Sequence, residues 1–126
     1  NCIAKALIDS GHSVIYFSAI DLFDTLSKNV FDKTKDNLYS FTNDLCNCDL
    51  VIVDDLGTEL TNSFVSSYLF AFLNGRNMQG KSTLISTNLT FKELGERYSE
   101  RTISRIISNF DIIETIGSDI RKQSKL

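Results

Sequence analysis

The sequence predicts an α/β fold, in which helices cover both faces of a mostly parallel sheet. Short β-branched and aromatic runs alternate with helical segments, the order that builds parallel sheets through right-handed crossovers. The run LVIV at 50–53 is apolar without interruption, which is typical of a strand buried on both faces. The 126 residues contain no proline and no repeat, so they suit one compact domain.

The first part of the chain predicts two helices around one strand. Residues 1–10 form a helical pattern that stops at Gly11, a good helix terminator. The run SVIYFS at 13–18 is β-branched and aromatic, which favours a strand. The segment 19–29 is an amphipathic helix. Residues 30–47 are polar and poorly periodic, so we expect a loop and a short helix there.

The middle of the chain predicts a strand, a helix and a second strand. After the strand at 50–53, Thr61 or Asn62 can cap a helix. That helix is expected to end before Gly75. The run STLIST at 82–87 predicts another buried strand.

The last part of the chain predicts two helices and a closing strand. The segment TFKE at 90–93 has the spacing of a capping box, which opens a helix. A second helix over 99–110 places its apolar residues on one stripe, namely Ile103, Ile106, Ile107 and Phe110. The segment DIIETI at 111–116 is expected to form the last strand.

Composition and charge exclude several classes of protein. The net charge is −3, so no global basic field attracts nucleic acid, and only the tail IRKQSKL is locally basic. No apolar run approaches the roughly 18 residues of a membrane span, and no signal-peptide pattern opens the chain. Three cysteines, two of them in the pair Cys46 and Cys48, and a single His12 do not form a usual zinc pattern. A cytoplasmic protein with reduced cysteines is the simplest interpretation.

Two adjacent acids, Asp54 and Asp55, follow the strand at 50–53. They are therefore expected at its carboxyl end, where open parallel sheets bind ligands. An acid in this position can hold Mg²⁺ through its water shell, while its neighbour orients or deprotonates an attacking water. A second interpretation stays open because Asp is common in turns: one acid caps the turn and the other is solvated.

Three segments carry a resemblance to a known family, in this order and spacing: VIVDDLGTEL, STLISTNLTFKEL and ERYSERTISRI. Together they resemble the AAA+ ATPases of bacterial replicative helicase loaders, of the DnaC and DnaI type. Transposase-helper ATPases of the IstB type are close relatives. The resemblance runs from Asn1 almost to the C-terminus. It implies a three-layer P-loop NTPase-like fold with strand order 5-1-4-3-2, of which 1–126 would be a partial AAA+ ATPase domain.

The resemblance also implies roles for individual residues. Asp54 would be the magnesium-side acid of a Walker B strand, and Asp55 the water-activating one, where many relatives have Glu. Asn88, at the end of LISTN, would be the sensor 1 residue that contacts the γ-phosphate or the attacking water. Arg121 in SDIRKQ would be a sensor 2 arginine, on weaker similarity.

The arginine-finger region of the family falls on Arg101 and Arg105, of which Arg105 is the better match. Because the two are four apart on the helix expected at 99–110, they share a face, opposite the isoleucine stripe. Such a face points away from the subunit's own core, as a finger that reaches a neighbouring subunit's nucleotide requires. A merely solvated charged face would have the same pattern.

The segment GRNMQGKS at 75–82 matches the phosphate-loop pattern G-x-x-x-x-G-K-[ST] letter for letter. A working phosphate loop follows a strand and opens a helix, so that backbone N–H groups and the helix dipole face the phosphates. Here the match follows a predicted helix and leads into the strand at 82–87. We therefore interpret it as a connection and expect Lys81 to have no phosphate-binding role.

The resemblance implies that the family's phosphate loop and first strand lie before Asn1. This chain would then lack both, and would be inactive on its own. The missing strand would leave an unpaired edge beside the strand at 82–87. We expect the last strand, at 111–116, to shift into this gap, or two chains to pair across it.

The leading hypothesis for function is the ATPase domain of a DNA replication protein that loads the replicative helicase onto DNA. By resemblance, its cofactors would be ATP and Mg²⁺, with ATP hydrolysed between subunits. Its partners would be a replicative helicase, single-stranded DNA and further copies bound through the arginine-finger face, with no membrane. Two alternatives are a transposase-helper ATPase of the IstB type and a non-hydrolysing α/β interaction module in which the acids are turn residues.

Overall fold

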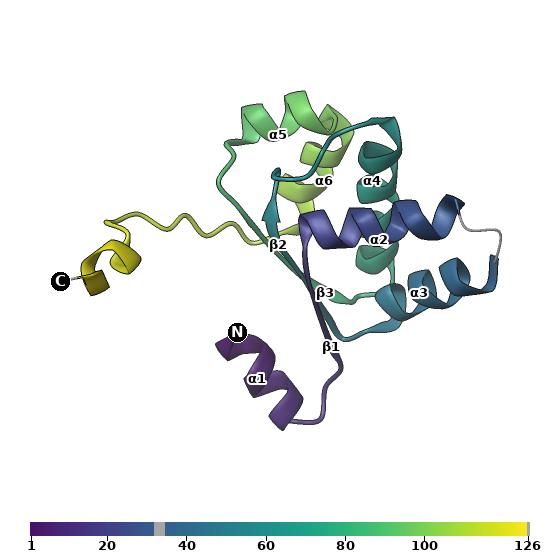
Figure 1. Cartoon of the computed structure of the whole chain (residues 1–126), viewed down its shortest axis with the longest axis horizontal. Helices are drawn as coiled ribbons and strands as arrows, with labels where there is room; N and C mark the ends of the chain where they lie inside the picture. The colour runs from purple at the N-terminus through teal and green to yellow at the C-terminus, as the bar shows by residue number, and fades with distance from the viewer. Residues whose placement is uncertain (32–34, 126) are drawn as a thin grey trace.

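The computed structural model describes residues 1–31 and 35–125 (Figure 1). Its helices and strands in chain order are α1 (Cys2–Asp9), β1 (Val14–Ser18), α2 (Ala19–Phe31), α3 (Lys35–Asn47), β2 (Leu50–Leu56), α4 (Ser63–Met78), β3 (Ser82–Thr87), α5 (Phe91–Arg97), α6 (Glu100–Asn109) and the 3-10 helix η1 (Ile120–Lys125). None of the helices in these residues is both long and apolar enough to cross a membrane.

The three strands form one parallel sheet in the order β1-β2-β3. Ser18 pairs with Asp54 across the first two strands, and Val53 pairs with Ile85 across the second and third. The α/β prediction with a parallel sheet is confirmed, and the order corresponds to strands 2, 3 and 4 of the arrangement that the resemblance implies. Because the strands are parallel, their carboxyl ends meet along one edge of the sheet and their amino ends along the other. We call these the carboxyl edge and the amino edge.

The core lies between one face of the sheet and the helices. Val51 and Val53 have no exposed surface and belong to this core. Its other fully buried aliphatic side chains come from α2, α3, β2 and α4, and are Ala19, Leu22, Leu26, Leu45, Leu56 and Leu69. By contrast, α1 buries none of its residues, and Figure 1 shows it lying apart from the other helices.

Side-chain caps fix the starts of three helices, as their sequences suggest. Asn62 caps α4 by accepting a hydrogen bond from the Val65 N–H at 2.9 Å. Thr90 and Glu93 form the expected capping box of α5, with both reciprocal hydrogen bonds present. Ser99 caps α6 in the same way, so the direction of each helix is set by its first turn.

Two helix boundaries differ from the prediction. The polar stretch at 30–47 contains the 13-residue helix α3 instead of a short helix. Residues 32–34 of this stretch lie outside the described residues. Leu45 of this helix is buried in the core, so tertiary packing stabilises a helix whose sequence pattern is weak. Helix α4 continues through Gly75 to Met78, and Gly80, with a φ of +66°, provides the left-handed turn after it.

The prediction of a last strand at 111–116 is wrong. This segment forms no strand and leaves the body of the protein as an extended tail after α6 (Figure 1). Ile113 and Ile116 are 85% and 90% exposed. Their apolar pattern favours a strand, but a strand also needs a partner edge, and in the described residues β3 pairs only with β2. We expected the tail to fill the gap beside β3, and it does not.

Candidate functional site

The predicted acid pair lies at the carboxyl edge of the sheet, near the end of β2. Asp54 accepts hydrogen bonds from two neighbouring strands: Tyr16 Oη donates to its Oδ2 and Ser86 Oγ to its Oδ1. The hydrogen bond from Ser86, followed by that from Tyr16, lowers the pKa of Asp54 below its ordinary value. Asp54 is therefore held as a carboxylate in a fixed orientation.

Asp55 adopts an unusual backbone conformation. Its φ is +55°, which makes it the one non-glycine residue with positive φ in the described chain. Its N–H donates to Ser86 Oγ at 2.9 Å, and its carbonyl accepts from Thr58 Oγ1 at 2.8 Å. The pairing of β2 with β3 shifts register between Val53 and Leu56, on either side of it. Such strain persists where surrounding contacts impose it, and it concentrates at functional sites.

Asn88 lies at the same edge, next to the acids' strand. It follows Thr87, the last residue of β3, and its side chain is exposed. The two strand ends are joined because Thr87 Oγ1 donates to the Leu56 carbonyl at 2.6 Å. The structure thus brings Asn88 to the edge that carries Asp54 and Asp55, as parallel strands require.

The two arginines lie on α6. Both are exposed, as their spacing predicts, whereas Ile103 and Ile106 of the same helix are buried. The Arg101 guanidinium lies over the Phe70 ring of α4, 4.4 Å from its centroid. The arginines share a groove of about 400 Å³, lined by Phe70, Glu100, Arg101, Ser104, Arg105 and Ser108. This arrangement presents the arginines outward, so they do not join Asp54 or Asp55 within one chain.

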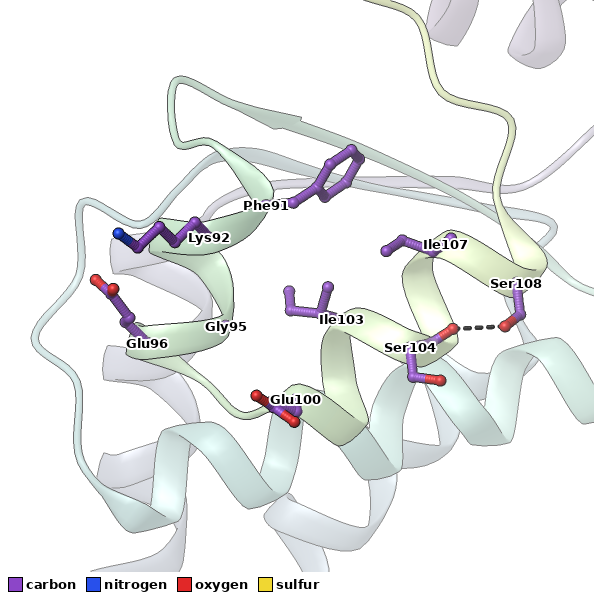
Figure 2. Close-up of a pocket in the computed structure, with 9 residues that line it drawn as sticks. All are labelled: Phe91, Lys92, Gly95, Glu96, Glu100, Ile103, Ser104, Ile107 and Ser108. Atoms are coloured by element: carbon purple, nitrogen blue, oxygen red, sulfur yellow. Dashed lines mark hydrogen bonds between the residues drawn. The ribbon is translucent and has the colours of Figure 1, made fainter.

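The predicted stripe on α6 is only partly buried, because Ile107 is 54% exposed. It lines a second groove of about 700 Å³ between α5 and α6, which Figure 2 shows with Phe91 and Ile103 facing the same space. Neither Asp54 nor Asp55 lines this larger groove, and the groove was not predicted from the sequence. In the sequence Ile107 belongs to a regular apolar stripe, so the pattern does not reveal that this side chain stays exposed.

Arg121 lies in the tail, at the start of η1. Its side chain donates to Asp119, with Nε 2.9 Å from Oδ1 and Nη2 3.2 Å from Oδ2. Asp119 is the main reason that the pKa of Arg121 is raised, and Asp55 makes a smaller contribution of the same sign. Arg121 is therefore within the electrostatic influence of Asp55, and it also donates hydrogen bonds to Asp119.

The phosphate-loop match lies at the opposite edge of the sheet. Gly75 to Met78 form the last turn of α4, and Lys81 precedes β3, so the match begins inside a helix and leads into the predicted strand. The Lys81 ammonium lies 3.4 Å from Asp49 Oδ1, beside the start of β2. In the described residues no strand leads through a glycine-rich loop into a helix.

The acid pair is a partial ligand set for a metal. Within residues 1–31 and 35–125 no group of three or more His, Cys, Asp or Glu side chains could hold an ion together. Magnesium normally uses only one or two carboxylates and completes its octahedral shell with water and substrate phosphates. Two acids fit that kind of ion, and they do not form an all-protein cage.

Three residues that shape the site were not predicted from the sequence. Tyr16 and Ser86 orient Asp54 from β1 and β3, and Glu59 is a buried acid in the turn that follows the pair. Cross-strand partners depend on register, which the isolated strand patterns do not specify. Glu59 could have been singled out from the sequence, because it is an acid only four residues after the predicted acid pair.

The sequence is similar to curated proteins of bacterial DNA replication. Replicative helicase loaders DnaC are 23% identical over 104 residues in Escherichia coli K12 and 24% identical over 106 residues in Buchnera aphidicola. The chain spans less than half of these relatives, 42% and 43% of their lengths, while the matches cover 82% and 84% of the chain.

Solved structures show the same fold. A replication initiator DnaA bound to AMPPCP and single-stranded DNA superimposes with a TM-score of 0.69 at 23% identity, covering 84% of this chain and 31% of that one. A DnaC helicase loader superimposes with a TM-score of 0.66 at 21% identity, covering 80% and 60%. The family described as IstB-like ATP binding protein matches residues 2–126. The chain therefore belongs to the IstB-like ATP binding protein family, and its resemblance to AAA+ ATPases of the DnaC type is confirmed.

Proposed function

We propose that residues 1–126 are part of an AAA+ ATPase domain that serves DNA replication by loading the replicative helicase. The observation that carries this proposal is the composition of the carboxyl edge. An oriented carboxylate, Asp54, a strained exposed neighbour, Asp55, and the exposed amide Asn88 lie at the ends of two adjacent parallel strands. Open α/β sheets bind ligands at this edge.

In the proposed reaction the cofactors are ATP and Mg²⁺, and the ion supplies charge that offsets the negative charge of the phosphates. Asp54, kept ionised by Ser86 and Tyr16, would hold the ion through its water shell. Asp55 accepts a proton from, or orients, the attacking water. Asn88 donates its amide hydrogens to the γ-phosphate or to that water.

The exposed position of the arginines supports the proposal that hydrolysis takes place between subunits. Arg101 and Arg105 are exposed on α6, in a groove that neither Asp54 nor Asp55 of the same chain lines. We infer that they act on the nucleotide of a neighbouring copy, which makes the α6 face a self-association surface. Arg105 is the proposed finger. Arg121 is the proposed sensor 2 residue, supported by the electrostatic influence of Asp55 on it.

The proposed partners rest on the relatives. The DnaC proteins are named as replicative helicase loaders, and one DnaA structure contains single-stranded DNA. We therefore propose a replicative helicase and single-stranded DNA as partners of the whole protein. A transposase-helper function is the second candidate, since the matching family is named for IstB. Co-purification of the whole protein with a replicative helicase separates the two.

The experiment that tests the site is an NMR titration of the chain with Mn²⁺ and ATP. Paramagnetic Mn²⁺ broadens the amide signals closest to it, so weak binding is enough. We expect broadening at Asp55 and Asn88, with none at Lys81 on the opposite edge, and loss of the broadening in Asp54→Asn. Broadening centred on Lys81 would restore the phosphate-loop match as the binding site. No broadening at either edge, in this chain and again in the whole protein, would favour the non-hydrolysing interaction module.

A further inference from the structure

A buried carboxylate lies in the turn that follows the acid pair. Glu59 is 4% exposed, and both of its carboxylate oxygens accept hydrogen bonds. The Gly57 N–H donates to Oε2 at 2.9 Å, and Tyr98 Oη donates to Oε1. The Arg97 Nε is 3.9 Å from Oε1, too far for a hydrogen bond, although this nitrogen is itself buried. A buried acid is costly unless specific donors satisfy it, so this one has a specific placement.

One end of this link reaches the acids. Gly57 is two residues after Asp55 and has a φ of +107°. A Cβ on Gly57 would lie 2.4 Å from Leu89 Cδ1, so the turn is pressed against the loop after β3. The Gly57 N–H bond to Glu59 fixes this turn from outside the sheet. It adds to the hydrogen bonds that Ser86 and Thr58 make with Asp55.

The other end reaches the helix that carries the arginines. Tyr98 immediately precedes Ser99, the residue that caps α6. The Tyr98 carbonyl accepts a hydrogen bond from Ser66 Oγ of α4, so the backbone at this junction is also fixed. Burial, and after it the hydrogen bond to Glu59, raises the pKa of Tyr98, which keeps its hydroxyl protonated as the donor. Glu59 thus connects the turn after the acid pair to the start of α6.

We propose that Glu59 is a positioning residue for the acid pair: through Gly57 and Tyr98 it holds the 57–59 turn against the α5–α6 junction and so maintains the left-handed conformation of Asp55. The proposal rests on the proposed function only in that Asp55 is the group being positioned. Glu59 itself does not face the open edge, because both of its oxygens are directed to Gly57 and Tyr98.

The test uses NMR of the chain without metal or nucleotide. A residue with positive φ gives a strong cross-peak between its own amide and α protons, so Asp55 has a distinct signature. In Glu59→Met the buried volume is kept but both acceptors are lost, and we expect the Asp55 cross-peak to fall to the strength of an ordinary strand residue. In Glu59→Gln an acceptor oxygen remains for Gly57, and we expect the cross-peak to be retained.

A matched control separates positioning from general loss of stability. Ser13→Ala removes hydrogen bonds at the amino edge and should lower the melting temperature while leaving the Asp55 cross-peak unchanged. An unchanged cross-peak in Glu59→Met would overturn the proposal, as would an equal loss in Ser13→Ala. If Glu59→Met does not fold, Tyr98→Phe decides: a weakened cross-peak supports the proposal and an unchanged one overturns it.

Because no nucleotide is present, this outcome is independent of the proposed function. Broadening by Mn²⁺ and ATP at Asp55 together with an unchanged cross-peak in Glu59→Met would preserve the function and reject the role of Glu59. The reverse pair of results would preserve the role of Glu59 and reject the function. The two proposals can therefore fail separately.

Discussion

The two edges of the sheet carry similar polar residues but are built differently. At the amino edge, Asp49 Oδ2 accepts hydrogen bonds from the Ser13 N–H at 2.9 Å and the Ser13 Oγ at 3.2 Å, and Lys81 approaches the other oxygen. At the carboxyl edge, Asp55 is strained and exposed, and Asn88 is exposed beside it. Where polar groups satisfy one another, an edge serves the fold. Where they are oriented yet open, an edge is available for a ligand.

A buried arginine completes the amino edge. Arg76 of α4 has no exposed surface, and its guanidinium donates to the Leu45 carbonyl and the Ser82 carbonyl, each at 2.5 Å. Its Nε donates to Thr83 Oγ1 at 2.9 Å. One side chain thus joins the end of α3 to the start of β3, next to the residues of the phosphate-loop match.

The largest expected effect comes from removing this arginine. Arg76→Met leaves the buried Leu45 carbonyl without this donor and removes the hydrogen bond to the Ser82 carbonyl, so the free energy of unfolding should fall by about 3 kcal/mol or more. Urea unfolding followed by circular dichroism measures it. The control is Arg105→Met, which changes an exposed arginine and should alter stability by less than about 0.5 kcal/mol. Equal effects of the two changes would show that the amino edge is not held by Arg76.

The next effect compares one glycine near each edge. Gly57 and Gly11 both have positive φ, but only at Gly57 would a Cβ meet a neighbour, Leu89 at 2.4 Å. Gly11→Ala should cost about 1 kcal/mol from backbone conformation alone. Gly57→Ala should cost about 2–3 kcal/mol, because the clash with Leu89 adds to it. Thermal unfolding of both variants tests this difference, and equal melting temperatures would refute the close packing at the carboxyl edge.

The contrast between edges also explains what the sequence can predict. Strand positions followed from uninterrupted apolar runs, so the placement of Asp54, Asp55 and Asn88 at one edge was predictable. The structural context of the phosphate-loop match, a helix before it and a strand after it, was also predictable from the pattern, while the absence of a phosphate-binding role stays a prediction. What escaped prediction depends on register and packing: that Ser86 bonds Asp54, and that Arg76 is buried.

The segments that were predicted wrongly share one physical cause. The tail at 111–116 has the composition of a strand, and α3 lacks a clear helical period. A strand requires a neighbouring edge and a weak helix requires a core to pack on, and neither partner is encoded within the segment itself. Local patterns therefore predicted the central sheet and most of the helices around it, and failed where a segment depends on a partner outside itself.

A pH titration sharpens the comparison further. The hydrogen bond from the Ser13 N–H is the main reason that the pKa of Asp49 is lowered to about 2. Because the folded pKa is depressed, this carboxylate contributes stability that is fully present above its unfolded pKa of about 4 and is lost as the pH falls toward 2. Urea midpoints measured from about pH 5 to about pH 2 should fall less steeply in Asp49→Asn than in the wild type. An unaltered slope would show that the hydrogen bonds of the Asp49 carboxylate do not stabilise the amino edge.

The smallest expected effect belongs to Lys81, and it bears on the whole assignment of the edges. The ammonium of Lys81 and the carboxylate of Asp49 are both partly exposed at 3.4 Å, so their attraction is weak and is screened by salt. Lys81→Ala should shift the urea midpoint only slightly at low salt and not at all at high salt. Calorimetric titration of the wild type and of Lys81→Ala with Mg-ATP should show no difference in binding, because this lysine has no helix N-terminus behind it. Loss of binding in Lys81→Ala alone would place the phosphates at the amino edge, and the open carboxyl edge with its strained Asp55 would then need another ligand.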